Sequence, residues 1–407
     1  MTYDTLGQRE PIQDIHDFRT IDIEKYSESA FSEFAGEVML LRLATQTKEK
    51  YSFEDFTSDD IENLRKPDQV IGRKTHDYKN RIRKTVKSIL PSYTQQEMAS
   101  NCLHDPIISK ILVKDINESL QKRNCSYTAD FFVDKNYPQA SVVCASLLSR
   151  QNLEVEQVRL EYEKLKGNKV NNFNGGADWI NNNFVGAYLR LYQNRIQKCP
   201  FFSGFESFCS MANGNIRYFL ELCHNAVKRH SNYKDGFSVD VIEQSHAAYL
   251  ASEKFVREVR SCGQLGNQLY AMVLTLGGLF SLSQRRMTQS EPEVSQFSVK
   301  GGDIEEDDRQ ILKEAIKWSV LFEERENKVK GTMDSEPLQW IFNPMYAPFF
   351  RISFRKKRKL ELDSCDLHVI LNGDRKQRDE LLDKFEKRWR DDTEECTRPE
   401  ANQGFLF

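Results

Sequence analysis

The 407-residue sequence lacks the patterns that mark metal-binding, secreted or membrane proteins. Its nine cysteines are an odd number with no C-x-x-C pair, which argues against a disulfide framework or a cysteine-based zinc site. The seven histidines are equally dispersed, so we expect no bound metal. The longest apolar-rich stretch, 269–282, is too short to span a bilayer. Residues 1–20 carry six charged side chains and no apolar segment, which argues against a secretory signal and favours the cytoplasm.

The chain also lacks the phosphate loop G-x-x-x-x-G-K-[ST]. The nearest Gly-Lys pairings, 72–74 and 167–169, have neither the paired glycines nor the hydroxyl that a magnesium ion requires. The run 111–115 looks like an acidic strand of a nucleotide site, but Lys114 interrupts it and Ile116 stands where a catalytic glutamate belongs. ATP hydrolysis by this chain alone is therefore unsupported. No Ser/His/Asp or Cys/His pattern indicates nucleophilic catalysis either.

Composition and periodicity predict a mainly α-helical protein. Hydrophobic residues are 39% and charged residues 29%, as in globular proteins, and the length predicts two or three domains. Apolar residues recur at helical spacing in eight segments. These are 22–43, 57–92, 139–166 (two helices joined near 151–152), 179–191, 239–259, 269–280, 307–322 and 374–390. The last is strongly charged, with Leu381, Phe385 and Trp389 on one face.

Short strands are expected only late in the sequence. Alternating residues predict two strands at 338–342 and 350–354, and a short edge strand near 294–299. Trp318 and Trp340 are expected in the core around these strands. A helix followed by short strands and a basic connector indicates a winged-helix module with a small β-hairpin.

The most informative block is the run 212–221. Gly214 permits a tight turn, and Asn215 can cap the helix that follows. Leu220 and Cys223 continue the buried stripe of that helix. Arg217 then lies at the helix start, where a guanidinium and backbone N–H groups can contact a phosphate. The alternative is a surface arginine after a common turn.

A second candidate is the basic run Arg355-Lys356-Lys357-Arg358-Lys359, which Arg351 precedes. On a wing, these cations would contact the phosphate backbone of DNA without reading its sequence, and binding would weaken steeply with salt. The alternative is a solvated hairpin or an internal partner for the acidic residues 303–308. The cationic face at 81–87 is a weaker version, and there a solvated helix is favoured.

Four blocks, in this order, resemble bacterial AAA+ ATPases of the origin-recognition-complex-like class. They are 179–183, 199–205, 212–221 and 340–348. The resemblance covers residues 1 to about 370 and implies the carboxy-terminal half of such a protein: a lid, a helical linker and a winged helix. It implies that Arg217, with Gly214 and Asn215, senses the γ-phosphate of ATP. Because the phosphate loop is absent, ATP would bind only with a core supplied by a partner chain, or the chain is a truncated or degenerate member.

The resemblance also suggests the domain boundaries. We expect a helical region with an insertion, following a missing ATPase core, over 1–138, a lid-like helical domain over 139–265 and a connecting helix over 266–289. A winged-helix domain over 290–372 and a charged helix and tail over 373–407 follow.

The expected function is that of a nucleotide-responsive, DNA-associated regulatory half of an AAA+ type ATPase that cannot hydrolyse ATP alone. Its expected partners are a chain carrying the phosphate-loop core, double-stranded DNA and further copies of itself, without a membrane. The sequence does not decide between replication-like loading and phage defence as the biological pathway of the protein. The alternative function is a non-catalytic helical and winged-helix scaffold for protein–protein interaction.

Overall fold

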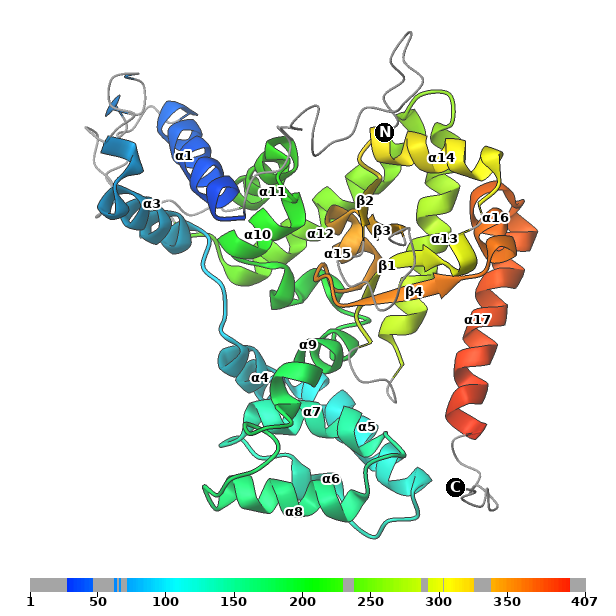
Figure 1. The fold of residues 1–407 in the computed structure, drawn as a ribbon. Coiled ribbons are helices and arrows are strands. Elements are labelled where there is room, and N and C mark those ends of the chain that lie inside the picture. The colour runs from blue at the N-terminus through cyan, green and yellow to red at the C-terminus, as the bar shows by residue number, and fades with distance from the viewer. Residues whose placement is uncertain are drawn as a thin grey trace, which may run out of the picture.

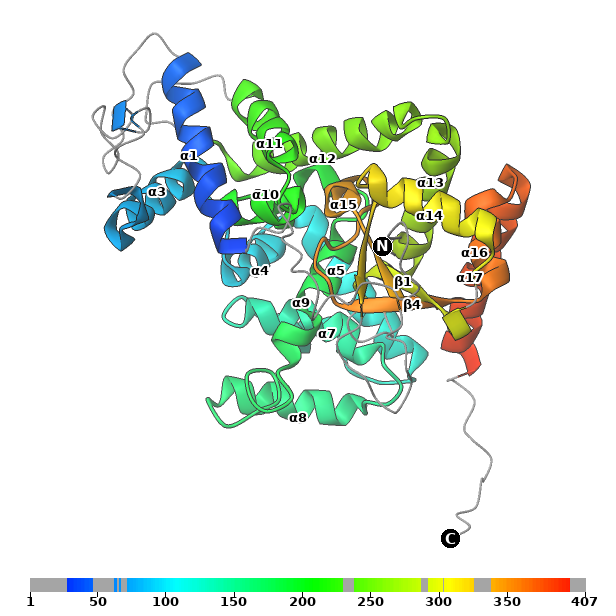
Figure 2. The same cartoon turned by 45° about the horizontal axis from the view of Figure 1, so that its top comes forward.

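The computed structural model describes residues 28–46, 62–63, 66, 72–229, 238–286, 292–302, 304–325 and 338–395. It is mainly helical, with one small four-stranded sheet in the carboxy-terminal part, so the predicted fold class is confirmed. Figures 1 and 2 show three groups of elements, which we call the upper bundle, the lower lobe and the sheet lobe. Among the described helices, none combines the length and apolar character needed to cross a bilayer. Residues 1–20, whose charged side chains argue against a secretory signal, lie outside the described residues.

The upper bundle combines helices that are far apart in the sequence. They are α1 (Glu28–Gln46), α3 (His76–Ile89), α10 (Phe205–Ala212), α11 (Ile216–Arg229) and α12 (Val241–Glu258). α1 packs on α3, α10 and α11, and α11 packs along α12. Thr75 caps the start of α3, since its side chain accepts a hydrogen bond from the Tyr78 N–H, and the helix ends before Pro91. Within the described residues, the main helix of the segment 57–92 thus begins only at His76.

The lower lobe contains the residues between α3 and α10. Its helices are α4 (Gln95–His104), α5 (Pro106–Lys122), α6 (Ala129–Phe132), α7 (Pro138–Leu148), α8 (Val155–Lys166) and α9 (Trp179–Leu191), with the 3-10 turns η3 (Ile196–Lys198) and η4 (Pro200–Phe202). α7 lies at the centre and packs on α4, α5, α8 and α9. The two helices predicted around 151–152 are confirmed as α7 and α8. Leu160 of α8 is exposed.

The chain leaves the upper bundle for the lower lobe and returns at one neck. The N–H groups of Phe205 and Val239 donate to the carbonyl oxygens of Leu90 (3.1 Å) and Ile89 (2.8 Å). Gln244 of α12, fully buried, joins the same stretches of chain. Its Oε1 accepts from the Gly204 N–H (2.8 Å). Its Nε2 donates to the carbonyl oxygens of Pro91 (3.0 Å) and Val239 (2.8 Å).

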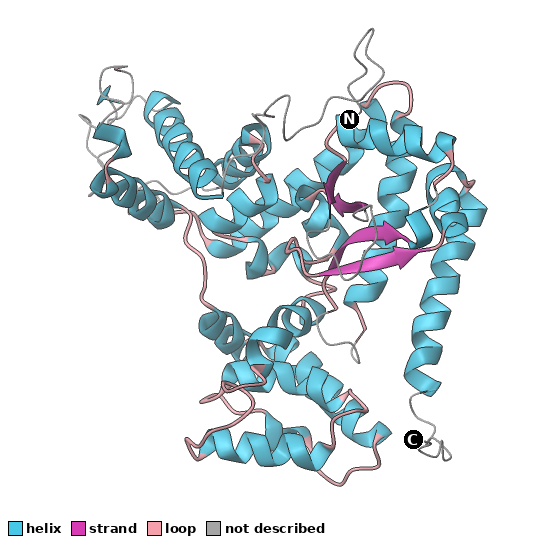
Figure 3. Cartoon of the chain, viewed as in Figure 1, coloured by secondary structure: helices cyan, strands magenta, loops and turns pink. Residues whose placement is uncertain are grey.

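The contacts therefore join α1 and α3 with α10–α12, across the lower lobe that separates them in sequence. The domain boundary expected between residues 138 and 139 stays a prediction. Figure 3 shows the same division by secondary structure, because all of the described strands lie in the sheet lobe.

The sheet lobe has the strand order β2-β3-β1-β4. Its elements are α13 (Gly266–Gln284), β1 (Val294–Val299), α14 (Glu306–Lys317), β2 (Leu321–Arg325), β3 (Leu338–Phe342), α15 (Ala347–Phe350), β4 (Arg358–Leu362), α16 (Ser364–Asn372) and α17 (Arg375–Glu395), with the 3-10 turns η5 (Val259–Ser261), η6 (Lys300–Gly302) and η7 (Pro344–Tyr346). β3 is antiparallel to β1 and β2, and β4 is parallel to β1. Phe297 stands opposite both Trp340 and Leu360 in the register, at the centre of the sheet.

Several predictions for this lobe were wrong in detail. β1 is an interior strand and not an edge strand, since β3 and β4 flank it. The strand predicted over 350–354 does not form, because Phe350 ends α15 and Arg351 takes a left-handed conformation with φ of 61°. The alternating apolar residues there pack as a loop, with the Phe354 ring stacked on Phe201 at 4.7 Å.

The helix predicted over 307–322 also ends early. It stops at Lys317, and Ser319 is left-handed with φ of 54°, so the chain turns into β2. Trp318 follows the end of α14 and is 40% exposed, and it was wrongly expected in the core. Its ring lies close to Gly263, beside the start of α13. Trp340 is buried as predicted.

The charged helix predicted at the end of the chain is confirmed as α17. Leu381, Phe385 and Trp389 are all buried, and α17 packs on α13 and α16. The apolar stripe at helical spacing was sufficient to identify the buried face.

Replacing Gln244 by alanine should destabilise the protein by about 2–4 kcal/mol, because one buried N–H and two buried carbonyls would be left without a partner. Gln121→Ala, at an exposed position of α5, is the matched control. Urea unfolding followed by circular dichroism measures both changes. Equal midpoints for the two variants would show that the neck does not depend on Gln244.

Candidate functional site

The turn before α11 has the local structure that its sequence predicts. Asn213 and Gly214 are left-handed, with φ of 46° and 81°. The Oδ1 of Asn215 then accepts hydrogen bonds from the N–H groups of Arg217 (3.0 Å) and Tyr218 (3.4 Å) and so caps the helix. Of the predicted stripe, Cys223 is buried and Leu220 is half-buried.

Arg217 lies on the surface at this helix start, with 68% of its side chain exposed. Its Nη2 donates to Oε2 of Glu258 on α12 at 2.8 Å. The guanidinium also lies over the Phe255 ring, 5.4 Å from its centroid. These two contacts orient the side chain without removing it from water. The nucleotide-sensing role of Arg217, Asn215 and Gly214 stays a prediction.

The residue after Arg217 connects this turn to the sheet lobe. Tyr218 is buried, its ring contacts that of Phe255 edge to face at 4.6 Å, and its hydroxyl accepts a hydrogen bond from Nδ2 of Asn343 at 3.4 Å. Burial raises the pKa of Tyr218, so its phenol stays neutral at physiological pH. Asn343 also donates to the Ser319 carbonyl (2.7 Å) and caps η7 through the Met345 N–H (2.9 Å).

Sequence reasoning did not single out Tyr218 or Asn343 as site residues. The signal for Asn343 was present, since an asparagine directly before Pro344 is a typical start of a short helix. Nothing in the sequence pairs Asn343 with Tyr218, because 125 positions separate them.

The basic run does not lie on the predicted hairpin. Arg355, Lys356 and Lys357 form an exposed loop, and Arg358 and Lys359 begin β4. Arg355 lies over the Phe201 ring at 5.6 Å, and Lys356 forms an ion pair with Glu324 of β2. These internal contacts hold part of the run against the protein. DNA contact by Arg351 and residues 355–359 stays a prediction.

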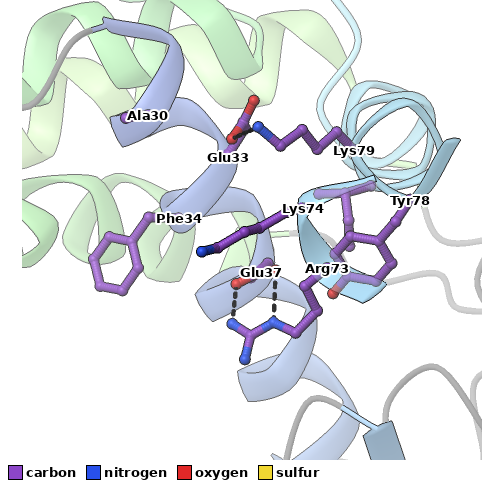
Figure 4. Close-up of a pocket in the computed structure, with 9 residues that line it drawn as sticks. Ala30, Glu33, Phe34, Glu37, Arg73, Lys74, Tyr78 and Lys79 are labelled. Carbon is purple, nitrogen blue, oxygen red and sulfur yellow. Dashed lines mark hydrogen bonds and ion pairs between the residues drawn. The ribbon is translucent and has the colours of Figure 1, made fainter. Parts of the chain in front are cut away.

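A groove of about 440 Å³ between α1 and α3 contains one of the Gly-Lys pairings noted in the sequence. Figure 4 shows Arg73 and Lys74 at its wall, with the Arg73 guanidinium turned to Glu37. The two hydrogen bonds of this pair measure 3.1 and 2.5 Å, and Lys79 pairs with Glu33 at 2.8 Å. Carboxylates thus offset two of the cations, which makes the groove a poor phosphate site.

The run 111–115 lies within helix α5 and not on a strand. Asp115 pairs there with Arg190 of α9, at 3.4 Å. Burial raises the pKa of Asp115 despite this neighbour. A carboxylate committed to a helix contact is not a magnesium ligand of the expected kind.

Burial makes Cys102 and Cys144 poor nucleophiles. None of the eight cysteines that the structure describes forms a disulfide. Burial raises the pKa of the Cys102 thiol to about 12 and that of the Cys144 thiol further, so neither forms a thiolate at physiological pH.

One group of side chains has the composition of a metal site. Glu305, Asp308 and His368 bring three ligand atoms within 4.8 Å of one another. Asp308 is buried, accepts a hydrogen bond from Asn372 Nδ2 at 2.6 Å and contacts His368 Nδ1 at 3.1 Å. These contacts already satisfy the carboxylate and tie α14 to α16, so we assign the group a structural role.

A comparison with protein-family models tests the family resemblance that the four sequence blocks suggest. The ORC-CDC6-like model matches residues 1–362. The chain belongs to the ORC-CDC6-like family. Neither the curated proteins nor the solved structures contain a match. Membership in the ORC-CDC6-like family confirms the AAA+ relation. That the chain is a carboxy-terminal half, that it is bacterial and that it lacks a core stay predictions.

Asn215→Ala should destabilise the protein by about 1 kcal/mol, because it removes the acceptor of two N–H groups at the start of α11. Arg217→Ala should cost less, since an exposed ion pair contributes at most about 1 kcal/mol. Asn101→Ala, on the exposed face of α4, is the control. Thermal unfolding compares the three, and a larger destabilisation by Arg217→Ala than by Asn215→Ala would contradict the order.

Proposed function

We propose that this chain is the nucleotide-responsive, DNA-associated regulatory part of an AAA+ type ATPase, and that a partner chain supplies the phosphate-loop core. The observation that carries the proposal is the placement of Arg217: exposed, at the amino end of α11, in a chain of the ORC-CDC6-like family. Such a helix end already favours an anion, because its N–H groups and macrodipole carry partial positive charge.

The strength of the Arg217 contacts supports a sensing role. The pair with Glu258 is exposed on both sides, so breaking it costs at most about 1 kcal/mol. A bidentate hydrogen bond to a phosphate is stronger, about 1.5–3 kcal/mol. Exchange of the carboxylate for a phosphate is therefore favourable once a partner brings ATP into reach.

The position of Tyr218 suggests how such a response would reach the rest of the chain. Any rotation at the start of α11 also moves the Tyr218 hydroxyl, whose partner Asn343 bonds the Ser319 carbonyl before β2 and the start of η7. The sheet lobe carries the basic run 355–359, the proposed DNA contact. Nucleotide binding and DNA binding would thus be coupled through one buried hydrogen bond between the upper bundle and the sheet lobe.

The proposal predicts that nucleotide affinity depends on Arg217 only when the core is present. Tagged chain, isolated from its natural host with the polypeptides that co-purify, is titrated with fluorescent ATP. In the isolated chain, Arg217→Ala should leave ATP binding unchanged. Arg217→Ala should weaken binding by the complex about 10- to 100-fold, because it removes a charge-assisted hydrogen bond.

Arg257→Ala is the matched control, because Arg257 lies on α12, is 70% exposed and also forms one ion pair with a glutamate. Equal ATP affinities for the two variants would remove the sensing role. Circular dichroism of both variants checks that the fold is retained.

DNA binding is tested by replacing the five cations of 355–359 with glutamine. The slope of log K against log salt should become shallower by about 0.9 for each phosphate that the variant no longer neutralises. The matched control replaces Arg81, Arg83, Lys84 and Lys87 of α3 in the same way. Unchanged affinity and slope for the first variant would reject the DNA contact and favour the interaction scaffold.

A further inference from the structure

A second hollow, of about 450 Å³, lies in the sheet lobe where α13, α15 and α17 meet. Figure 1 shows these elements at the right of the molecule, with α15 nearest its centre. Arg285 reaches the hollow from the end of α13 and Arg351 from the end of α15, with Glu386 of α17 on the third side. The turn at Arg217 and the basic run 355–359 both lie outside this hollow, which shares only Arg351 with the proposed DNA contact.

The two guanidinium groups differ from the other arginines discussed above. Arg73, Arg217 and Arg257 each pair with a glutamate. The side chains of Arg285 and Arg351 form no hydrogen bond, ion pair or ring contact with the residues that the structure describes. Two cations and one carboxylate leave the hollow with a net positive charge. Carboxylates therefore neutralise the cations of this hollow less than those of the groove between α1 and α3.

The walls of the hollow are fixed by packing. Gly278 lets α17 approach α13, since a Cβ at this position would lie 3.2 Å from the Leu382 side chain. Arg351 is held left-handed at the end of α15, and its carbonyl accepts a hydrogen bond from Gln193 Nε2 at 3.3 Å. The backbone that carries Arg351 is therefore fixed before any ligand arrives, so binding has to order mainly the arginine side chains.

We propose that this hollow binds the phosphate group of a small phosphorylated ligand, held between Arg285 and Arg351. Guanidinium groups match phosphate oxygens in charge and in hydrogen-bond geometry. The hollow is open to solvent on one side and so admits a small phosphorylated ligand, whereas contacts to a DNA backbone do not require a hollow. A bound phosphate would bridge α13 and α15, and Glu386 would weaken it by like charge.

The test uses the full chain and three probes: inorganic phosphate, AMP and a short DNA duplex, titrated by calorimetry. Arg285→Gln and Arg351→Gln should each lower the affinity for phosphate or AMP about tenfold, the effect of removing one charge-assisted pair. Glu386→Gln should raise it, because an opposing charge is removed. Arg375→Gln, on α17 and 96% exposed, should leave it unchanged.

Tighter binding of AMP than of phosphate would identify a nucleotide as the ligand, and equal binding would identify the phosphate alone. Circular dichroism confirms that each variant is folded. The proposal is overturned if neither small probe binds, if Arg375→Gln reduces binding as much as Arg285→Gln, or if the two arginine variants weaken only the duplex. This test does not depend on the sensing role of Arg217, because Arg217 does not line the hollow.

Discussion

The arrangement of the molecule depends on the neck between the upper bundle and the lower lobe. The buried side-chain amide of Gln244 joins the chain segments there. It joins the chain leaving α3, the chain entering α10 and the start of α12. Without this junction, the lower lobe would separate α1 and α3 from the helices on which they pack. A buried amide costs free energy unless its partners are present, so the loss of any of the three contacts would destabilise the neck. Because α12 also carries Glu258 and Phe255, the same helix positions Arg217.

The candidate phosphate sites differ in how far carboxylates already pair with their cations. In the groove of Figure 4, Glu37 and Glu33 already satisfy Arg73 and Lys79, and a phosphate would have to displace partly buried carboxylates. Arg217 has one exposed partner, which water and salt weaken. Arg285 and Arg351 have none among the described residues. The order of increasing readiness for an anion is therefore the groove, Arg217 and then the hollow beside α17.

The sequence predicts most helices because their signals are local. The stripe Leu381, Phe385 and Trp389 fixes the buried face of α17, and Asn215 fixes the start of α11. Signals of the sheet are weaker, since alternation over 350–354 arises from loop packing and not from strand pairing. Residues far apart in the chain form the pairing of β1 with β3 and β4. The contacts of Gln244 also join distant residues. No local pattern contains that information.

The same limit applies to the proposed site. The turn around Gly214 and the exposed arginine are local features, and the sequence predicts them. The contact of Tyr218 with Asn343 is not local, yet it is the step that would make a phosphate at Arg217 matter to the sheet lobe. A ligand shifts a conformational balance only by its difference in affinity for the two states. Since Tyr218 is buried and its hydroxyl accepts from Asn343, a rotated α11 would leave one N–H of the Asn343 amide unpaired, while the bond to the Ser319 carbonyl remains, and that cost would separate the two states.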